Sequence, residues 1–256
     1  MATSTATWRV ISRIASIAGM IPTPSDPRPP GANREWVDLH EDILACTRCA
    51  DAGHIPVAVP MFQGLPGQVL MLVGQAPGER ELGPRKPFAG RSGAELTRWA
   101  VRAGFRDDNH FRSLTYITSV TKCFPGKART GGGDRRPSGA EVLACRGWLE
   151  GQLALQRPRL LLLVGGLAHD AFEVTSKKPM EALVGSVYDA AGRDHSASIL
   201  GGSGMPAVAP LPLHLPLPHP SGASRWLNLP AHREQLGGAL RVLELLWPQL
   251  VKDGYL

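Results

Sequence analysis

The sequence predicts an α/β protein, a three-layer α/β/α sandwich around a central, mostly parallel sheet of four strands. Short apolar runs alternate along the chain with longer segments of helical periodicity. Each run is apolar at successive positions, which is typical of strands that helices cover on both faces. A polar loop rich in glycine or proline follows most of these runs, as expected where a strand leaves a sheet.

The expected elements follow in chain order. A helix over residues 34–45 precedes the turn Cys46-Thr-Arg-Cys49. Strands are expected at residues 69–73, 114–120 and 159–164, and at the proline-containing segment 207–217. Further helices are expected at residues 94–101, 139–155, 168–172 and 231–246, the last with leucines at the spacing of a core-facing helix.

Composition is that of a folded globular protein. The 256 residues are 43% hydrophobic and 20% charged, and no apolar run approaches the roughly 20 residues of a membrane span. Lys and Arg number 28 against 22 Asp and Glu, which gives a formal net charge of +6 and permits a polyanionic partner. We expect a monomer without membrane association.

The N-terminal segment differs in composition from the rest of the chain. Residues 1–33 predict a flexible tail and a proline-rich linker, and residues 34–256 predict a single domain. Residues 1–25 carry Arg9 and Arg13 but no acid, so the sequence leaves an organellar transit peptide open. We otherwise expect the protein in the cytoplasm, associated with the nucleoid.

Four loops are expected to meet at one edge of the sheet. The loop from Gly74 to Gly93 is rich in glycine and proline, which stiffens it and lets its backbone approach a ligand closely. Other loops follow the later strands and begin at Lys122, Gly165 and His219. Ligands of open α/β sheets bind where the carboxyl ends of strands meet, so these loops predict one binding site.

The four cysteines, Cys46, Cys49, Cys123 and Cys145, are too few for a disulfide scaffold. Their spacing is neither that of a zinc ribbon nor that of a thioredoxin motif. It fits a [4Fe–4S] cluster or a four-cysteine zinc site. Two free core thiols beside an incidental C-x-x-C segment is the alternative interpretation.

Two further segments carry candidate chemistry. The loop from Lys122 to Arg136 holds five basic residues, one acid and three consecutive glycines, which favours either a phosphate contact or a solvated loop. His219-Pro-Ser221 predicts an imidazole held rigidly at the sheet edge, although a structural histidine remains the alternative. A donor held in this way stabilises a developing oxyanion by about 3 kcal/mol.

Taken together, these segments resemble the uracil-DNA glycosylase superfamily, in its iron–sulfur branches, families four and five. The stretch from Gly74 to Phe88 is similar to the family motif G-E-A-P-G-x-x-E-D-x-x-G-x-P-F. His219-Pro-Ser221 with the later Arg225 is similar to its H-P-S motif, and the four cysteines correspond to its cluster ligands. The resemblance extends from Cys46 to the last helix.

The resemblance implies a monofunctional DNA repair glycosylase that hydrolyses the N-glycosidic bond of uracil, or of a related deaminated base, flipped out of single- or double-stranded DNA. His219 and Gln75 would be catalytic. The implied substrate contacts are Gly74, Gln75, Ala76, Pro77, Phe88 and Ser119. The implied DNA contacts are Ser221, Arg225, Lys127, Arg129, Arg135 and Arg136. The implied cofactor is a structural [4Fe–4S] cluster bound by Cys46, Cys49, Cys123 and Cys145, with zinc as the alternative.

The chain departs from the family pattern at several positions. Gln75 replaces a glutamate, Ala76 stands where other branches place a water-activating residue, and Ser119 replaces the asparagine that reads the uracil edge. A shorter donor would weaken base discrimination. The basic loop lacks the histidine of the branch that crosslinks to uracil, so no stable covalent product is expected. Glu81 is a candidate water-positioning acid.

These departures leave other interpretations open. A non-catalytic iron–sulfur protein that binds nucleic acid and retains the fold is the main alternative. A nucleotide-handling α/β enzyme is a further one, although the sequence lacks a phosphate-loop motif and the dinucleotide-binding glycine pattern.

Overall fold

The predicted fold class is confirmed. The computed structural model describes residues 32–130, 133–202, 209–221 and 225–254, so the expected tail lies almost wholly outside the described residues. Four parallel strands form one sheet in the order β2-β1-β3-β4. They are β1 (Leu70–Gly74), β2 (Thr115–Ser119), β3 (Leu160–Val164) and β4 (Leu213–Leu217).

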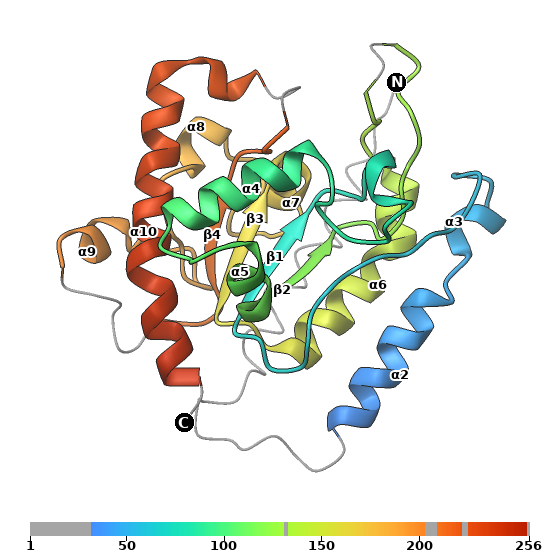
Figure 1. Cartoon of the computed structure of the whole chain (residues 1–256), viewed down its shortest axis with the longest axis horizontal. Helices are drawn as coiled ribbons and strands as arrows, with labels where there is room; N and C mark the ends of the chain where they lie inside the picture. Colours follow the sequence, from blue (N-terminus) through green and yellow to red (C-terminus); the bar gives the residue numbers. More distant parts are fainter. Residues whose placement is uncertain (1–31, 131–132, 203–208, 222–224, 255–256) are drawn as a thin grey trace.

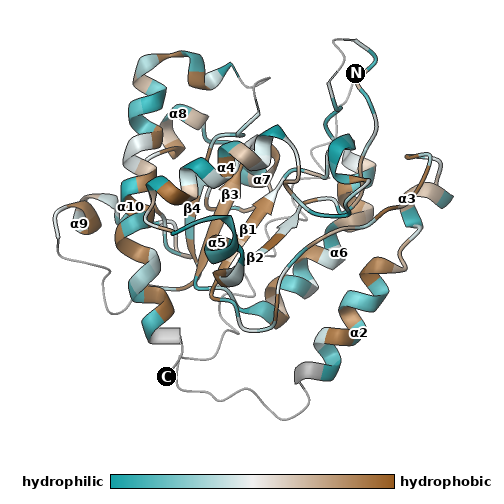
Figure 2. Ribbon diagram, in the orientation of Figure 1, coloured by the Kyte–Doolittle hydropathy of each residue, from teal (hydrophilic) through white to brown (hydrophobic). Residues whose placement is uncertain are grey.

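Helices cover both faces of the sheet because alternate strand residues point to opposite sides (Figure 1). Leu70 and Leu72 of β1 belong to a first core with α4 (Arg91–Arg102), α5 (Asp108–Leu114) and α10 (Pro230–Gly254). Met71 and Val73 belong to a second core with α6 (Gly139–Gln156) and α7 (Gly166–Asp170). Every strand residue is buried, and Figure 2 shows the hydrophobic strands at the centre of the fold.

A directional chain of hydrogen bonds ties α2 (Ala32–Leu44) to the second face of the sheet. The carbonyl of Trp36 can only accept, so His40 donates to it from Nδ1 over 2.5 Å. His40 Nε2 then accepts from the Tyr116 hydroxyl at 2.5 Å, and that oxygen accepts from Gln152 at 2.7 Å. Gln152 in turn accepts from the Thr118 hydroxyl at 2.9 Å. This chain fixes α2, and hence the C-x-x-C segment that follows it.

Some element boundaries differ from the sequence expectation. β4 begins at Leu213, later than expected, and Pro216 lies within it. Leu213 donates its N–H toward β3 and His214 donates on the opposite side, to Tyr188. The missing N–H of Pro216 therefore faces the outer edge of the sheet, where proline is tolerated. α10 continues past the expected end at 246 and through Pro248 to Gly254.

The sequence expectation omitted one helix that matters for the site. In α5, Asp107 is the N-cap residue and accepts the His110 backbone N–H at 2.7 Å. The C-x-x-C segment, expected as a turn, leads into the short helix α3 (Arg48–Asp51). The other short helices are η3 (Glu79–Glu81), α8 (Met180–Leu183), α9 (Ser196–Leu200) and η4 (Trp226–Asn228). In the part of the chain described, none of the helices has the length and apolarity to span a membrane.

We expect the free energy of unfolding to fall as the pH drops below about 6.5, the ordinary pKa of histidine. Burial lowers the pKa of His214 to about 4 and also lowers the pKa of His40, His169 and His219. Between pH 4 and 6.5 the unfolded chain therefore binds protons that the folded chain does not. Urea denaturation at several pH values measures the slope, and His214→Gln should flatten it. If the free energy of unfolding of His214→Gln depends on pH as steeply as that of the wild type, the lowered pKa assigned to His214 is contradicted.

Candidate active site

A single cavity of about 390 Å³ lies at the carboxyl ends of the strands, within the usual size range of small-molecule sites. It brings together residues from all four expected loops, which are separated by more than 140 positions in sequence at the extremes. The site residues from the sequence analysis that line it are Gly74, Gln75, Ala76, Pro77, Phe88, Ser119, Arg135, His219 and Ser221.

Phe88 forms one wall of the cavity in a constrained conformation. Its φ angle is +56°, a left-handed conformation that an aromatic residue rarely adopts. A Cβ atom on Gly74 would lie 3.2 Å from Phe88 Cζ, so the glycine at the end of β1 leaves space for the ring. A Cβ on Gly93 would lie only 1.7 Å from the Phe88 carbonyl oxygen, so the start of α4 also requires glycine.

His219 presents a defined tautomer to the cavity. The backbone N–H of Ser221 donates to Nδ1 over 3.2 Å, so Nδ1 is unprotonated and the neutral ring carries its proton on Nε2. Burial lowers the pKa of His219, which favours this neutral form. Gly165, at φ +86°, lies against the ring, since a Cβ there would come within 3.3 Å of the imidazole. The site therefore holds a rigid, neutral N–H donor.

Ser119 is oriented differently from the sequence expectation, which treated it as a short donor. Its hydroxyl donates to the Thr121 carbonyl at 2.7 Å, and the residue is only 7% exposed. The hydroxyl proton is thus already used, and only lone pairs remain for a ligand. Ser119 can accept a hydrogen bond from a ligand in the cavity but cannot donate one.

Two carboxyl groups line the cavity, and sequence reasoning identified only one of them as a candidate. Glu81 and Asp134 both approach Gly78: a Cβ there would lie 3.0 Å from Asp134 Oδ2 and 3.9 Å from Glu81 Oε1. Burial raises the pKa of Glu81 to about 7, and the charge of Asp134 adds to the rise. Backbone N–H groups of Gly78 and Phe88 oppose it. Asp134 was visible in sequence only as the single acid of the basic loop.

Three of the four basic loop residues assigned to DNA contact are in ion pairs within the protein. Lys127 Nζ lies 2.6 Å from Glu79 and 3.1 Å from Asp134, and these side chains are roughly half exposed. Arg136 lies 2.9 Å from Asp170 at an exposed position. Arg135 donates to both oxygens of Glu141 at 2.7 Å and to the His54 carbonyl at 3.0 Å.

The Arg135–Glu141 pair differs from the others because Glu141 is 3% exposed in its side chain. Exposed pairs contribute about 0–1 kcal/mol and exchange partners readily. A bidentate pair with a buried carboxylate does not exchange partners in this way. Arg135 is therefore part of the structural framework, whereas Lys127 and Arg136 are able to release their partners. Arg129 and Arg225 are exposed and lie outside the cavity lining.

The four cysteines converge on a second cavity, behind the basic loop. Cys46 and Cys49 come from the segment after α2, Cys123 follows β2, and Cys145 lies in α6. All four line this cavity, together with Lys122, Glu141 and Trp148, among others. The convergence of thiols from three separate segments of the sequence argues against the interpretation as an incidental C-x-x-C segment with free core thiols.

The surroundings of the sulfur atoms fit those of metal-bound thiolates. Cys145 Sγ accepts the Lys122 backbone N–H at 3.2 Å, and Cys46 Sγ accepts the Trp148 indole N–H at 3.3 Å. Burial raises the pKa of Cys49 to about 11 and that of Cys123 to about 12, and neighbouring thiols add to both. Four such groups become thiolates together only when a cationic centre compensates their charge.

The described residues include no group of three or more His, Cys, Asp or Glu side chains placed to hold one metal ion. A tetrahedral zinc ion needs every sulfur about 2.3 Å from a single point. The donor set of four soft sulfurs is compatible with a zinc ion or with a larger polynuclear centre.

Fold and site define an α/β protein with a ligand cavity at the rim of a parallel sheet and a separate four-thiol centre. Residues 62–241 match the family model described as Uracil DNA glycosylase superfamily, and the chain belongs to that superfamily. The Type-4 uracil-DNA glycosylase of Pyrobaculum aerophilum is 35% identical over 127 residues, 50% of this chain and 59% of that protein. The Type-4 uracil-DNA glycosylase of Thermotoga maritima is 30% identical over 152 residues, 59% of this chain and 72% of that protein.

Similarity to a type-5 protein is shorter. The Type-5 uracil-DNA glycosylase of Pyrobaculum aerophilum is 40% identical over 63 residues, 25% of each chain. The chain spans 59% and 53% of the length of the type-4 proteins of Pyrobaculum aerophilum and Sulfurisphaera tokodaii. The resemblance to families four and five is thus confirmed, and type-4 proteins account for the longer matches.

We expect Arg135→Met to lower the free energy of unfolding by about 1–3 kcal/mol, because it leaves the buried Glu141 carboxylate without its guanidinium partner. Arg136→Met, the matched variant at the neighbouring exposed pair, should change it by less than about 0.5 kcal/mol. Urea denaturation of the two variants measures the difference. Equal effects would show that Arg135 is not part of the framework.

Proposed function

We propose that this protein is a monofunctional DNA glycosylase that releases uracil, or a related deaminated base, from DNA. The observation that carries the proposal is the partly buried His219, held as a neutral Nε2–H donor in the same cavity as the Phe88 ring. The Nε2–H, which has no acceptor among the residues that the structure describes, suits an oxygen that gains negative charge, and the Phe88 ring suits a planar base. Superfamily membership and the type-4 relatives support this reaction.

The reaction would begin with a nucleotide flipped out of the base stack, at a cost of a few kcal/mol. Phe88 would stack on the base, and Gln75 with its backbone neighbours would contact the base edge. As the glycosidic bond breaks, its electron pair goes to the base and the sugar becomes oxocarbenium-like. His219 would donate from Nε2 to the base oxygen, and water would then add to the sugar carbon.

Ala76 provides no group to activate that water, so stabilisation of the departing base would supply most of the rate enhancement. A preorganised donor in a dry site contributes about 3 kcal/mol. Glu81 and Asp134 are the carboxyl groups in the cavity that could orient water. Either carboxylate would act as an acceptor for one water proton, so that no water-activating side chain would be needed at the position of Ala76.

Base recognition would rest on Ser119 as an acceptor. Because its hydroxyl donates to Thr121, Ser119 would accept a ring N–H of the base, such as that of uracil. It would offer no donor to the neighbouring base carbonyl. A site that makes one such contact in place of two discriminates less strongly among bases.

DNA backbone contacts would come from exposed basic side chains around the cavity. Lys127, Arg129, Arg136 and Arg225 are exposed, and the ion pairs of Lys127 and Arg136 can be exchanged for phosphate contacts. Arg135 would brace the loop, and Ser221 would hold phosphate at the edge of the cavity. Residues 34–256 would act as a single domain, as a monomer, on DNA in the cytoplasm.

A [4Fe–4S] cluster would be bound by Cys46, Cys49, Cys123 and Cys145. Support comes from the soft donor set and the N–H groups directed at two sulfurs. The cluster would supply covalent cross-linking between α2, β2 and α6, with no part in bond breaking. It would thereby brace the start of the basic loop.

The test of the function is incubation of purified protein with uracil-containing single- and double-stranded oligonucleotides, followed by alkaline cleavage of abasic sites. We expect base release, and we expect His219→Ala to lower the single-turnover rate at least about tenfold while its circular dichroism stays that of the wild type. Absence of release with uracil, hypoxanthine and xanthine would refute the function. Undiminished activity of the histidine variant would refute only the role of His219.

We expect the protein purified without oxygen to be brown, with absorbance near roughly 400 nm and about four irons per chain, as a cubane cluster requires. Cys123→Ser should remove this absorbance and lower the midpoint of thermal unfolding, since three connected elements lose their common ligand. Metal analysis of the same sample distinguishes the alternatives. A colourless protein that contains zinc would refute the cluster.

A further inference from the structure

The turn that carries Phe88 requires support from its surroundings. Phe88 at φ +56° and Arg85 at φ +49° are both left-handed within four residues. Such conformations cost about 1–3 kcal/mol each for residues with a side chain, and they persist only when neighbouring groups hold them. The support must therefore come from contacts made by the rest of the fold.

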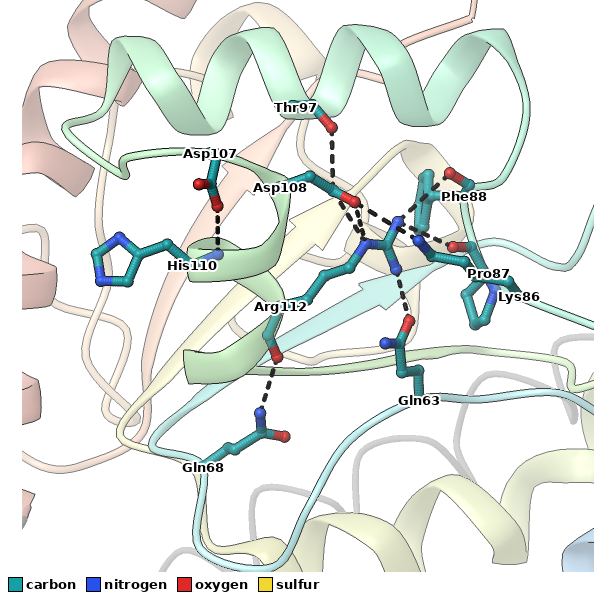
Figure 3. Close-up of polar contacts among 10 residues, drawn as sticks. All are labelled: Gln63, Gln68, Lys86, Pro87, Phe88, Thr97, Asp107, Asp108, His110 and Arg112. Carbon is teal, nitrogen blue, oxygen red and sulfur yellow. Dashed lines mark hydrogen bonds and ion pairs between the residues drawn. The ribbon is translucent and has the colours of Figure 1, made fainter.

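Arg112 of α5 contacts this turn and is not part of the cavity lining (Figure 3). Its Nη2 donates to the Pro87 carbonyl at 3.2 Å and to the Phe88 carbonyl at 3.4 Å. Arg112 is 8% exposed, so these bonds form with little competition from water. They connect the guanidinium to the backbone just before and at the aromatic residue.

The guanidinium is itself fixed by two further partners. Its Nε donates to both carboxylate oxygens of Asp108, at 2.9 and 2.8 Å, and its Nη1 donates to Gln63 at 2.6 Å. Asp108 also accepts from the Thr97 hydroxyl at 3.0 Å and lies 3.6 Å from the Lys86 ammonium. A planar guanidinium held at this many points has little freedom to move.

Other contacts complete the support of Phe88. The Glu81 carboxyl group accepts its backbone N–H, so Arg112 and Glu81 bind opposite backbone groups of the same residue. The Phe88 ring is adjacent to Gly74 and the Phe88 carbonyl is adjacent to Gly93. Phe88 leaves no room for a side chain at either glycine. Removal of Arg112 would break both of these hydrogen bonds, to the Pro87 and Phe88 carbonyls.

We propose that Arg112 is a positioning residue that sets the angle and depth at which the Phe88 ring enters the cavity, and hence the stacking of the flipped base. This inference rests on the proposed function, because it needs Phe88 to stack on a base. Arg112 does not line the cavity and would not touch the substrate. A well-packed apolar side chain stabilises a fold as well as a buried ion pair does, so stability alone does not require an arginine here.

The experiment compares variants that separate the ion pair from the contact with the turn. Asp108→Asn removes the ionic partner and keeps the Arg112 bonds to the two carbonyls. The double variant Arg112→Met/Asp108→Asn removes both groups of the pair, so that the charge left without this partner is that of Lys86, whose side chain is 44% exposed. Arg112→Lys keeps the charge but cannot reach two carbonyls and a carboxylate together. Arg241→Met, at an exposed pair with Glu244 on α10, is the unrelated control.

Binding is measured with a duplex that contains the non-hydrolysable 2′-fluoro-2′-deoxyuridine, and KM and kcat are measured with a uracil-containing duplex. Stacking of a base on an aromatic ring contributes about 1–3 kcal/mol, so we expect Kd and KM to rise at least about fivefold in the double variant and in Arg112→Lys. Asp108→Asn should change them less than about twofold, and Arg241→Met not at all. Each comparison uses protein with a wild-type circular dichroism spectrum, and Arg112→Lys decides the result where the double variant does not fold.

A double-mutant cycle tests whether the effect acts through the ring. In a Phe88→Ala background, Arg112→Lys should weaken binding no further. In a His219→Ala background, it should weaken binding as much as it does in the wild type. If the wild type is active and Asp108→Asn raises Kd and KM as much as the double variant does, the inference is overturned. An Arg112→Lys loss that persists without Phe88 would also overturn it. A wild type that releases no base refutes the proposed function instead, and this inference with it.

Discussion

The site depends on one constraint: four parallel strands end together at the same edge of a sheet that is buried on both faces. Gly74, Ser119 and the loops that begin at Gly165 and His219 are distant in sequence, yet the parallel register brings them to one rim. Strand residues before the carboxyl ends are buried inside the fold and do not line the cavity. Polar chemistry therefore concentrates in the loops, where glycine at the strand ends leaves room for the phenyl and imidazole rings.

A single ion pair joins this rim to the thiol centre. Arg135 lines the ligand cavity, and its partner Glu141 lines the cavity of the four cysteines. Glu141 also receives the Ser138 N–H at 2.6 Å and so caps α6, the helix that carries Cys145. A centre bound to the thiols would stabilise the first turns of α6 and, through this pair, the basic loop. The basic loop is therefore anchored to the framework at Arg135, which itself lines the cavity.

Sequence reasoning could predict that these candidate residues meet at one edge of the sheet because its signals are local. Glycines at strand ends, a proline-fixed histidine and cysteines in a characteristic spacing are all properties of short segments, and the alternation of strands and helices placed them at one edge. It could not find Arg112, because nothing near that residue in the sequence distinguishes it from a surface arginine of a helix. Its role arises from a helix that packs against a turn some 24 positions earlier. The same limit applies to the hydroxyl of Ser119, whose direction depends on the carbonyl of Thr121.

The electrostatics of the cavity favour a reaction driven by the leaving group. A protonated imidazole would meet little solvent here, and burial lowers the pKa of His219, so the resting group is a neutral donor. A neutral imidazole carries no positive charge that the site would have to stabilise before the base departs. Its hydrogen bond to the base strengthens only as negative charge develops on the base. In the proposed reaction the Asp134 carboxylate, and Glu81 in its ionised form, would act in the opposite sense, since negative charge nearby favours a cationic sugar. The imidazole donor and the two carboxyl groups lie at different points of one cavity. They thus match the negative charge of the departing base and the positive charge of the sugar that separate when a glycosidic bond breaks, without a general base at position 76.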